Sequence, residues 1–361
     1  MTTMRAESTL DPPVSPAPIL TVRDLCTWYY SSEGLVRAVD GVNFDVHAGR
    51  TLGIVGESGC GKSVTARSIL RIVEKPGRIV RGSIHLHPAH GQGAPRDLVK
   101  LEADGPEMRS IQGGDIALVF QEPMTSFSPV HTVGNQIVET IQLHDRTMNK
   151  QMAHDRAIEL LRMVGIPRPE RRVDEFAYQL SGGLRQRAMI ALALACDPRL
   201  LIADEPTTAL DVTTQAQILE LLRQLQAERG MAIMLITHNL GVIAEMADDV
   251  AVMYLGRVVE QATVRELFRS PQHPYTRALL RSIPSLHSPP RQPISTIEGS
   301  VPHPLNRPTG CPFHPRCEVA IAGSCDVHTP DLLPIGSGPV PTLVSCFQHH
   351  PVDAGGNREV G

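Results

Sequence analysis

Short apolar runs recur along the first two thirds of the chain and end at glycines or polar side chains. The runs at 51–56, 116–120, 200–203 and 232–236 are almost entirely apolar. Runs of this length are typical of strands that are buried on both faces of a sheet. The pattern therefore predicts a central sheet whose strands lie far apart in the chain.

Other segments carry apolar residues at helical spacing, which predicts helices at 64–72, 133–164 and 212–229. The middle of these belongs to a helical insertion of about residues 122–195, which is expected to form an accessory lobe. Residues 82–113 are rich in Gly, Pro and His and are expected to be an irregular surface loop.

Two more strands are expected at the edge of the same domain, at residues 19–25 and 39–46. The aromatic residues Trp28, Tyr29 and Tyr30 stand between them. A ring just ahead of a phosphate-binding loop can stack on adenine, whereas the alternative is a hydrophobic cluster on an edge strand. Position alone does not separate the two interpretations.

The length of 361 residues allows two domains, and the formal charge of −4 comes without any Lys/Arg block, which argues against a nucleic-acid-binding surface. The longest apolar run, 188–196, is far short of the roughly 18 residues that span a bilayer. Residues 1–18 lack the apolar core of a signal peptide and are expected to be a disordered tail. Sixteen of the thirty prolines fall within 266–361, which indicates a loop-rich extension.

The motif GESGCGKS lies between the apolar strand at 51–56 and a predicted helix. Its glycines let backbone N–H groups wrap phosphates, Lys62 reaches the β- and γ-phosphates, and the Ser63 hydroxyl binds Mg²⁺. The predicted nucleotide-binding residues of this loop are Gly56, Glu57, Ser58, Gly59, Cys60, Gly61, Lys62, Ser63 and Val64. A helix N-terminus can lower the pKa of Cys60, but a small side chain in place of serine is the favoured interpretation.

Further polar residues stand at the ends of the other apolar strands. Asp204 and Glu205 close the run at 200–203, Gln121 closes the run at 116–120, and His238 follows the run at 232–236. Strand ends of this kind meet at the ligand-binding edge of an α/β sheet. Gln121 can reach the Mg²⁺ or the attacking water there, although an ordinary surface glutamine is the alternative.

The stretch LSGGLRQR combines a glycine pair with the start of a helix and can hold a phosphate through Ser181, Gly182 and Gly183. With this motif the chain resembles the ATP-binding subunits of ABC transporters over about residues 19–285. Seven elements occur in the order of that family: Tyr29 as the adenine-stacking aromatic, GESGCGKS as Walker A, Gln121 as the Q-loop, LSGGLRQR as the signature, LLIADE as the Walker B strand, Ala209–Asp211 as the D-loop and His238 as the switch histidine.

The resemblance implies an α/β fold: a P-loop ABC ATPase domain at 19–265, with a mixed sheet, an antiparallel edge subdomain and a helical lobe, followed by a small Cys-containing extension at 266–361. It also implies a head-to-tail dimer in which ATP lies between the Walker A loop of one subunit and Ser181 and Gly183 of the other. Asp204 would position Mg²⁺, together with Ser63 and Gln121.

Glu205 would be the general base, with His238, Gln121 and Lys62 as the other catalytic residues, and Asp211 would link the two nucleotide sites across the dimer.

Two segments resemble the oligopeptide/dipeptide importer ATPases. They are ELFRSPQHPYTRALLRSIPSL, at 266–286, and FQEPMTSFSP, which includes the expected hinge at 123–129. The second segment has Phe127-Ser128 where Leu-Asn is expected in that family. In the family it lies near the membrane subunits.

Four cysteines cluster in the extension with the spacing C-x5-C-x7-C-x20-C: Cys311, Cys317, Cys325 and Cys346. This spacing is not the paired C-x2-C of a zinc ribbon, and four thiolates suit either an iron–sulfur cluster or Zn²⁺. Some dipeptide-importer ATPases carry a four-iron cluster in this extension, so the resemblance favours [4Fe-4S], with zinc, reduced thiols or disulfides as alternatives.

The resemblance implies a peripheral subunit on the cytoplasmic side of the inner (plasma) membrane, where ATP hydrolysis drives uptake of di- or oligopeptides. Its expected partners are two transmembrane permease subunits, a second ATPase subunit (a paralogue or another copy of this chain) and an extracytoplasmic substrate-binding protein, with no nucleic acid. Related systems import nickel, haem or sugars. An exporter ATPase and an ABC ATPase of DNA repair or translation are further alternatives, against which stand the HPYTRALL-type linker and the single cassette.

Overall fold

A computed structural model describes residues 17–89, 93–122, 126–208, 210–283, 297–336 and 341–351. Nearly all of the expected tail at 1–18 lies outside these ranges, as do Ala209 of the D-loop and the last residues of the 266–286 linker. Within the described ranges, every helix is too short or too polar to cross a bilayer.

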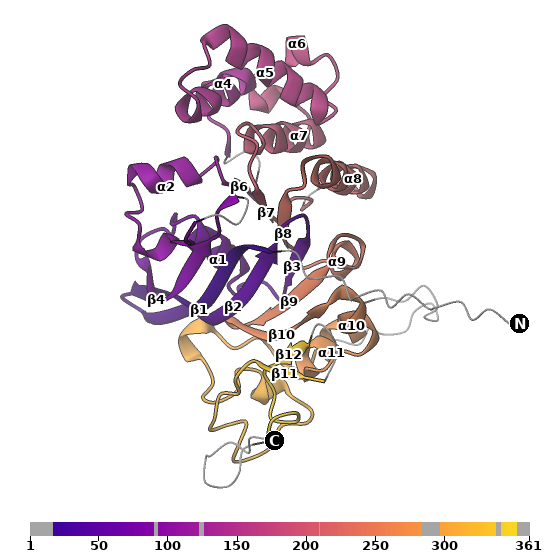
Figure 1. Cartoon of the computed structure of the whole chain (residues 1–361). Helices are drawn as coiled ribbons and strands as arrows, with labels where there is room; N and C mark the ends of the chain where they lie inside the picture. Colours follow the sequence, from indigo (N-terminus) through magenta and orange to yellow (C-terminus); the bar gives the residue numbers. More distant parts are fainter. Residues whose placement is uncertain are drawn as a thin grey trace, which may run out of the picture.

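An eight-stranded mixed sheet forms the centre of the molecule, in the order β11-β12-β10-β9-β3-β8-β7-β6 (Figure 1). The strands are β3 (Thr51–Val55), β6 (Ile116–Val119), β7 (Leu200–Asp204), β8 (Ala232–Ile236), β9 (Asp249–Tyr254), β10 (Arg257–Thr263), β11 (Leu333–Ile335) and β12 (Thr342–Val344). The block from β9 to β6 is parallel, so β3, β6, β7 and β8 all end at one edge. The four predicted apolar strands are confirmed.

A second, antiparallel sheet has the order β2-β1-β4-β5 and confirms the predicted edge subdomain. Its strands are β1 (Pro18–Ser31), β2 (Gly34–His47), β4 (Gly77–Leu86) and β5 (Arg96–Asp97). The expectation of an irregular loop at 82–113 was wrong, because β4, β5 and the helix α2 (Pro106–Ile111) occupy much of it. Pairing of β4 with β1 over most of its length outweighs the local Gly and His content.

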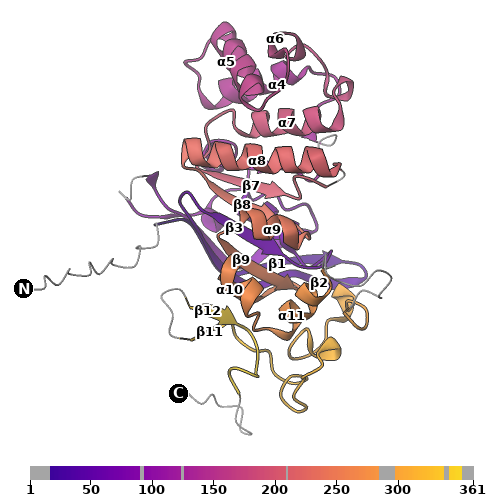
Figure 2. The same cartoon turned by 90° about the vertical axis from the view of Figure 1, so that its right-hand side faces the viewer.

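The helical lobe consists of α4 (Val133–His144), α5 (Lys150–Met163), α6 (Pro169–Arg172) and α7 (Gly182–Ala193). Figures 1 and 2 show it at one end of the molecule, beyond the central sheet. The side chains of Thr132 and Asn149 cap α4 and α5 by accepting backbone N–H groups. The predicted helical insertion is thereby confirmed.

The remaining helices pack around the sheet: α1 (Lys62–Ile69), α8 (Val212–Arg229), α9 (Leu240–Met246), α10 (Val264–Arg269) and α11 (Pro274–Arg281). The helix expected at 212–229 is confirmed at both ends. The helix expected at 64–72 ends earlier, at Ile69, because Arg71 adopts a left-handed conformation with φ 59°.

Two hydrophobic cores lie on opposite faces of the central sheet. Along β7, Leu200 and Ile202 belong to the core shared with the antiparallel sheet, whereas Leu201 and Ala203 belong to the core shared with the helical lobe. Because both faces of these strands are covered, every residue of β7 and β8 is buried. This two-sided burial explains why the strands read as continuous apolar runs.

The C-terminal extension joins the main sheet instead of forming a separate layer. Strand β12 pairs antiparallel with β10, and β11 pairs with β12. The rest of the described extension is mostly turns and short 3-10 helices, η4 (Pro304–Asn306) and η5 (His314–Arg316). It lies at the opposite end of the molecule from the helical lobe (Figure 2).

Candidate functional site

The phosphate-binding loop runs from Gly56 to Ser63, between β3 and α1. Gly56 has φ 154° and Gly61 has φ 101°, conformations that favour glycine. A Cβ atom at Gly56 would come within 2.2 Å of the Met253 carbonyl oxygen, and one at Gly61 equally close to that of Ala38. Both glycines are therefore required by the packing of the loop against β9 and β2.

Lys62 is buried at the start of α1, with 6% of its surface exposed. Its Nζ donates to the backbone carbonyls of Gly56, at 2.8 Å, and Glu57, at 3.1 Å. The ammonium group thus points back into the concave side of the loop, where anionic oxygens would compete for it. Lys62 therefore lies inside the predicted phosphate loop, and its role toward phosphate stays a prediction.

Cys60 is packed inside the same loop, with only 2% exposure. Burial raises the pKa of its thiol, and the neighbouring Lys62 opposes this only in part. The alternative of a thiol with a lowered pKa is therefore wrong, and the interpretation as a small buried side chain is supported.

Two predicted Mg²⁺ ligands face each other at the end of β7. The Ser63 hydroxyl donates to the Asp204 carboxylate at 3.0 Å. Burial raises the pKa of Asp204, and the hydrogen bond from Ser63 counteracts it. A hydroxyl and a buried carboxylate at this separation are a donor set that suits Mg²⁺.

Glu205, the residue after Asp204, bonds to side chains that follow three different strands. It accepts hydrogen bonds from the Gln121 amide, at 3.1 Å, and the Thr208 hydroxyl, at 2.9 Å, and its other oxygen lies 3.1 Å from His238 Nδ1. Burial opposes ionisation of Glu205, yet the hydrogen bonds from His238 and Thr208 bring its pKa below the usual value. Two predicted residues, Gln121 and His238, thus meet at the carboxylate of a third, Glu205.

Thr208 also belongs to this site, although it was not predicted from the sequence. It lies in the turn after β7, where Glu205 itself has a left-handed backbone with φ 48°. The PTT triplet after the Walker B carboxylates was the available signal, since a hydroxyl three residues after a carboxylate at a turn can bond back to it.

The signature residues lie away from this cluster. Ser181 caps α7 by accepting the Leu184 N–H group, and a Cβ atom on Gly183 would meet Thr214 at the start of α8. Asp211 caps α8 and accepts from the backbone and the hydroxyl of Thr214, which lowers the pKa of its carboxyl.

In Figures 1 and 2, α7 lies in the helical lobe and α8 lies between it and the body of the molecule that carries α1. The structure therefore brings the signature together with the D-loop, and not with the phosphate loop of the same chain.

The aromatic triplet belongs to β1. Arg37 stacks over Trp28, with 5.0 Å between its guanidinium carbon and the ring centroid, and Arg78 stacks over Tyr30 at 4.3 Å. The half-buried Tyr29 ring packs against Gly77, where a Cβ atom would come within 2.6 Å of the ring. The triplet thus lies on a strand and not between strands, and the role of Tyr29 toward adenine stays a prediction.

The Phe127-Ser128 pair faces the helical lobe. Phe127 is 5% exposed and belongs to the core of that lobe. The backbone N–H and carbonyl of Ser128 both bond to the Gln136 side chain, at 2.8 and 3.3 Å. Phe127 is therefore accommodated in the hydrophobic core, and Ser128 is held through its backbone.

All four cysteines of the extension line one small cavity, together with His273 and His314. They are free thiols, and burial together with the other three thiols raises the pKa of Cys311 to about 12. The cavity measures about 10 Å³, and the described part of the chain contains no group of three or more Cys, His, Asp or Glu placed to hold a metal ion. The four cysteines thus line the same cavity, but in the described part of the chain they are not arranged as a set of metal ligands.

Comparison with known proteins matches two family models. One is the ABC transporter family, over residues 39–208, and the other is the oligopeptide/dipeptide transporter C-terminal region, over residues 259–325. The "probable peptide ABC transporter ATP-binding protein y4tR" of Sinorhizobium fredii is 51% identical, over 89% of this chain and 92% of that protein.

This chain belongs to the ATP-binding subunits of peptide-type ABC transporters. The dipeptide transport ATP-binding protein DppD of Haemophilus influenzae is 44% identical over 94% of this chain and 97% of its own length. Among solved structures, the dimeric bacterial ABC transporter cassette MJ0796 matches 68% of this chain and 99% of its own, at 28% identity and a TM-score of 0.59. The P-loop ABC ATPase fold expected from the sequence is thus confirmed.

Proposed function

We propose that this ATP-binding subunit hydrolyses ATP to drive uptake of di- or oligopeptides through separate membrane subunits. The observation that carries the proposal is the meeting of Gln121, Asp204, Glu205 and His238 at one sheet edge beside the phosphate loop. Phosphoryl transfer needs little covalent chemistry from the protein, so positioned charges and hydrogen bonds of this kind suffice.

Glu205 is the general base in this proposal. Its carboxylate is held by three side chains and is ionised at neutral pH, so it can accept a proton from a water that attacks the γ-phosphate. His238 is 61% exposed on its side chain and can turn toward the γ-phosphate, while Gln121 orients the water. Lys62 exchanges its two carbonyl contacts for phosphate oxygens.

The residues that would hold Mg²⁺ are Ser63 and Asp204. Gln121 would be the third ligand, because its amide bonds to Glu205, the residue next to Asp204. Mg²⁺, when bound, supplies positive charge to the phosphate oxygens. Two further roles in nucleotide binding belong to this proposal. Tyr29 stacks on adenine, and the loop from Gly56 to Val64 wraps the phosphates.

The nucleotide sites are composite in this proposal. Ser181, Gly182 and Gly183 of one subunit complete the site of a second ATPase subunit, a paralogue or another copy of this chain, and Asp211 links the two sites. The separation of the signature from the phosphate loop within one chain supports this arrangement. MJ0796, the structural relative, is described as a dimer.

Two transmembrane permease subunits and an extracytoplasmic substrate-binding protein complete the proposed transporter. The chain would lie peripherally on the cytoplasmic side of the inner membrane. A cassette domain at 19–265, with a helical lobe at about 122–195, and an extension at 266–361 are the proposed domains. The names of DppD and of the oligopeptide transport protein AppD of Bacillus subtilis support peptides as cargo.

Copurification from membranes, with mass spectrometric identification of the partners, tests the proposal. We expect two membrane subunits and an ATPase subunit. ATPase activity of the complex should rise with a binding protein that is loaded with a dipeptide, and not with one loaded with nickel, haem or a sugar. Recovery with ribosomes or DNA, or stimulation by one of the other cargoes alone, would contradict peptide import.

We also propose that Cys311, Cys317, Cys325 and Cys346 hold a [4Fe-4S] cluster, which requires the small cavity to open. The support is the convergence of four free thiols on one cavity, in a lobe with little regular structure that a bound metal would stabilise. Anaerobic purification should yield about four irons per chain and a brown protein. A colourless protein with one zinc per chain, or one without metal, would contradict the cluster.

A further inference from the structure

Glu57, the second residue of the phosphate loop, is held through all of its polar groups. Its backbone N–H donates to the Tyr275 hydroxyl at 3.0 Å, and its carbonyl accepts from Lys62 at 3.1 Å. Its carboxylate accepts two hydrogen bonds from Arg316, at 2.8 and 3.2 Å. Two of these three partners come from the C-terminal part of the chain, more than two hundred residues away.

Arg316 is nearly enclosed, with 4% of its side chain exposed, against 25% for Glu57. Beyond its two bonds to Glu57, its Nη1 donates to the Tyr254 hydroxyl at 3.3 Å, and its Nε donates to the Glu298 carbonyl at 3.1 Å. A two-pronged contact of guanidinium with carboxylate fixes both partners in orientation as well as in position. Arg316 therefore ties the extension to the phosphate loop.

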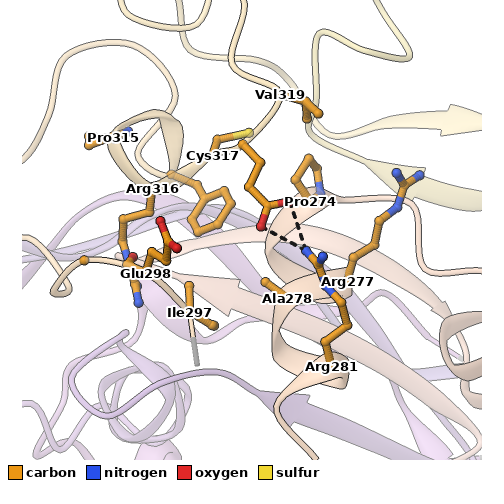
Figure 3. A pocket seen from close by; sticks show the side chains of 13 residues that line it. Pro274, Arg277, Ala278, Arg281, Ile297, Glu298, Pro315, Arg316, Cys317 and Val319 are labelled. Atoms are coloured by element: carbon orange, nitrogen blue, oxygen red, sulfur yellow. Dashed lines mark hydrogen bonds and ion pairs between the residues drawn. The ribbon is translucent and has the colours of Figure 1, made fainter. Parts of the chain in front are cut away.

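An aromatic cluster packs beside the contact between Arg316 and Glu57. Tyr275 of α11 packs on Tyr254 of β9 with 4.7 Å between ring centroids, and Phe313 of the extension packs on Tyr254 at 5.3 Å. Tyr254, Tyr275 and Phe313 are almost fully buried. Figure 3 shows Arg316 and Cys317 side by side on the extension, facing the residues of α11 across a cavity.

We propose that Arg316 and Tyr275 are positioning residues for nucleotide binding, through which the C-terminal extension holds the phosphate loop in its binding conformation. This role rests on the proposed function, because it requires that the loop binds ATP. Tyr275 fixes the backbone of Glu57, and Arg316 neutralises its carboxylate.

The sign of the charges makes Arg316 the more important of the two. A triphosphate carries several negative charges, and Glu57 adds another to the loop that receives them. With Arg316 in place the pair is neutral. Without it an unpaired carboxylate would repel the nucleotide, and the loop would lose its anchor to the extension.

Binding of a non-hydrolysable ATP analogue, adenylyl-imidodiphosphate with Mg²⁺, to the full-length chain by calorimetry tests the proposal. Arg316→Ala should raise the Kd at least fivefold, which lies within the usual range of coupling between linked sites. Arg316→Lys, which keeps the charge, should raise it less. Tyr275→Phe, which keeps the ring and loses the hydroxyl, should raise it about two- to fivefold.

The double variant Glu57→Gln, Arg316→Ala separates positioning from mere structural support. Removing the repelling charge should recover a measurable part of the affinity that Arg316→Ala loses. The deficit of Arg316→Ala should also shrink between 50 and 500 mM salt, because salt screens the repulsion. A double variant that binds no better than Arg316→Ala would overturn the charge argument.

Arg281→Gln is the matched control, because Arg281 pairs with Glu318 in the same region, at 3.3 Å, without contacting the phosphate loop (Figure 3). It should leave the Kd within twofold of the wild type. If Arg316→Ala lowers only the melting temperature and leaves the Kd unchanged, the proposal is wrong. If the wild-type chain does not bind the analogue, the proposed function fails instead.

Discussion

Glu205 contacts neighbours that follow three different strands. Gln121 follows β6, Thr208 follows β7 and His238 follows β8. A carboxylate that accepts several hydrogen bonds keeps its charge despite partial burial. One side chain can therefore be both fixed in orientation and ready to accept a proton.

Replacement of this carboxylate should separate binding from chemistry. Glu205→Gln is nearly isosteric and keeps an oxygen for the Thr208 hydroxyl, but it cannot accept the proton of the attacking water. ATPase turnover should fall by about 100-fold or more, with the Kd for ATP nearly unchanged. Turnover like that of the wild type, measured by phosphate release, would remove Glu205 from the role of base.

Thr208 offers a milder test of the same carboxylate. Thr208→Val keeps the shape and removes the hydrogen bond of 2.9 Å, so the orientation of Glu205 should loosen. We expect kcat to fall about three- to tenfold, the usual worth of one such bond. Thr208→Ser, which keeps the hydroxyl, is the control and should retain most of the activity. Equal loss in both variants would assign Thr208 to packing.

The positions of residues that follow an apolar strand were predictable, because the carboxyl ends of parallel strands meet at the same edge of a sheet. Gln121, Asp204, Glu205 and His238 were found in this way, and the strand ends bring them to one edge. Lys62 and Ser63 were found from the glycine-rich motif. Arg316 was not predictable, because its partner Glu57 is remote in sequence and nothing in the extension marks an arginine that reaches back to the phosphate loop.

At the scale of elements, the position of α11 depends on one buried carboxylate in β10. Glu260 has no exposed surface, and its two oxygens accept the backbone N–H groups of Gln272 and His273 at 2.8 Å each. Burial raises the pKa of Glu260, and these two bonds counteract it. His273 in turn caps α11 by accepting the Tyr275 N–H group at 3.1 Å.

Glu260→Ala should therefore loosen the start of α11. Two backbone N–H groups would lose their acceptor inside the protein, and a cavity would remain, so the free energy of unfolding should fall by about 2–4 kcal/mol. Hydrogen exchange should accelerate at the amides of Gln272 and His273. The neighbouring Gln261→Ala is the control, with an expected loss below about 1 kcal/mol. Equal losses in the two variants would count against this role.

Elements that are buried on both faces, or that have clear helical spacing and caps, were predictable from local sequence. The strand β4 was missed, because it contains Gly82 and His85 and is stabilised by its long pairing with β1. The helix α11 was missed in a Pro-rich region, because its one proline, Pro274, stands at the first turn, where proline fits. Tertiary pairing and the position of a proline within a helix are not visible in composition.

At the scale of the whole molecule, each chain carries both halves of a nucleotide site at separate places. The phosphate loop leads into α1, and the signature lies at the start of α7 in the helical lobe, beyond α8 (Figure 1). In the proposed arrangement, a second ATPase subunit completes the site of each chain. Nucleotide binding would then bring two subunits together, and hydrolysis would release them.

Ser181→Arg tests whether the signature of one chain completes the nucleotide site of another. Because Ser181 does not contact the phosphate loop of its own chain, the isolated variant should bind ATP with a Kd within twofold of the wild type. In the assembled complex the bulky cation would block the site of the partner, and ATPase activity should fall by about 100-fold. Lys62→Ala, in contrast, should weaken binding already in the isolated chain. Lost affinity in isolated Ser181→Arg would contradict a composite site.

The pairing of β12 with β10 protects one edge of the main sheet from association with other molecules. The strands β11 and β12 are three residues each and close one border of the sheet. Short terminal strands leave little exposed backbone for another molecule to extend. A chain that lost them would present the longer β10 as an open border, and we expect it to self-associate into aggregates before it lost the capacity to fold.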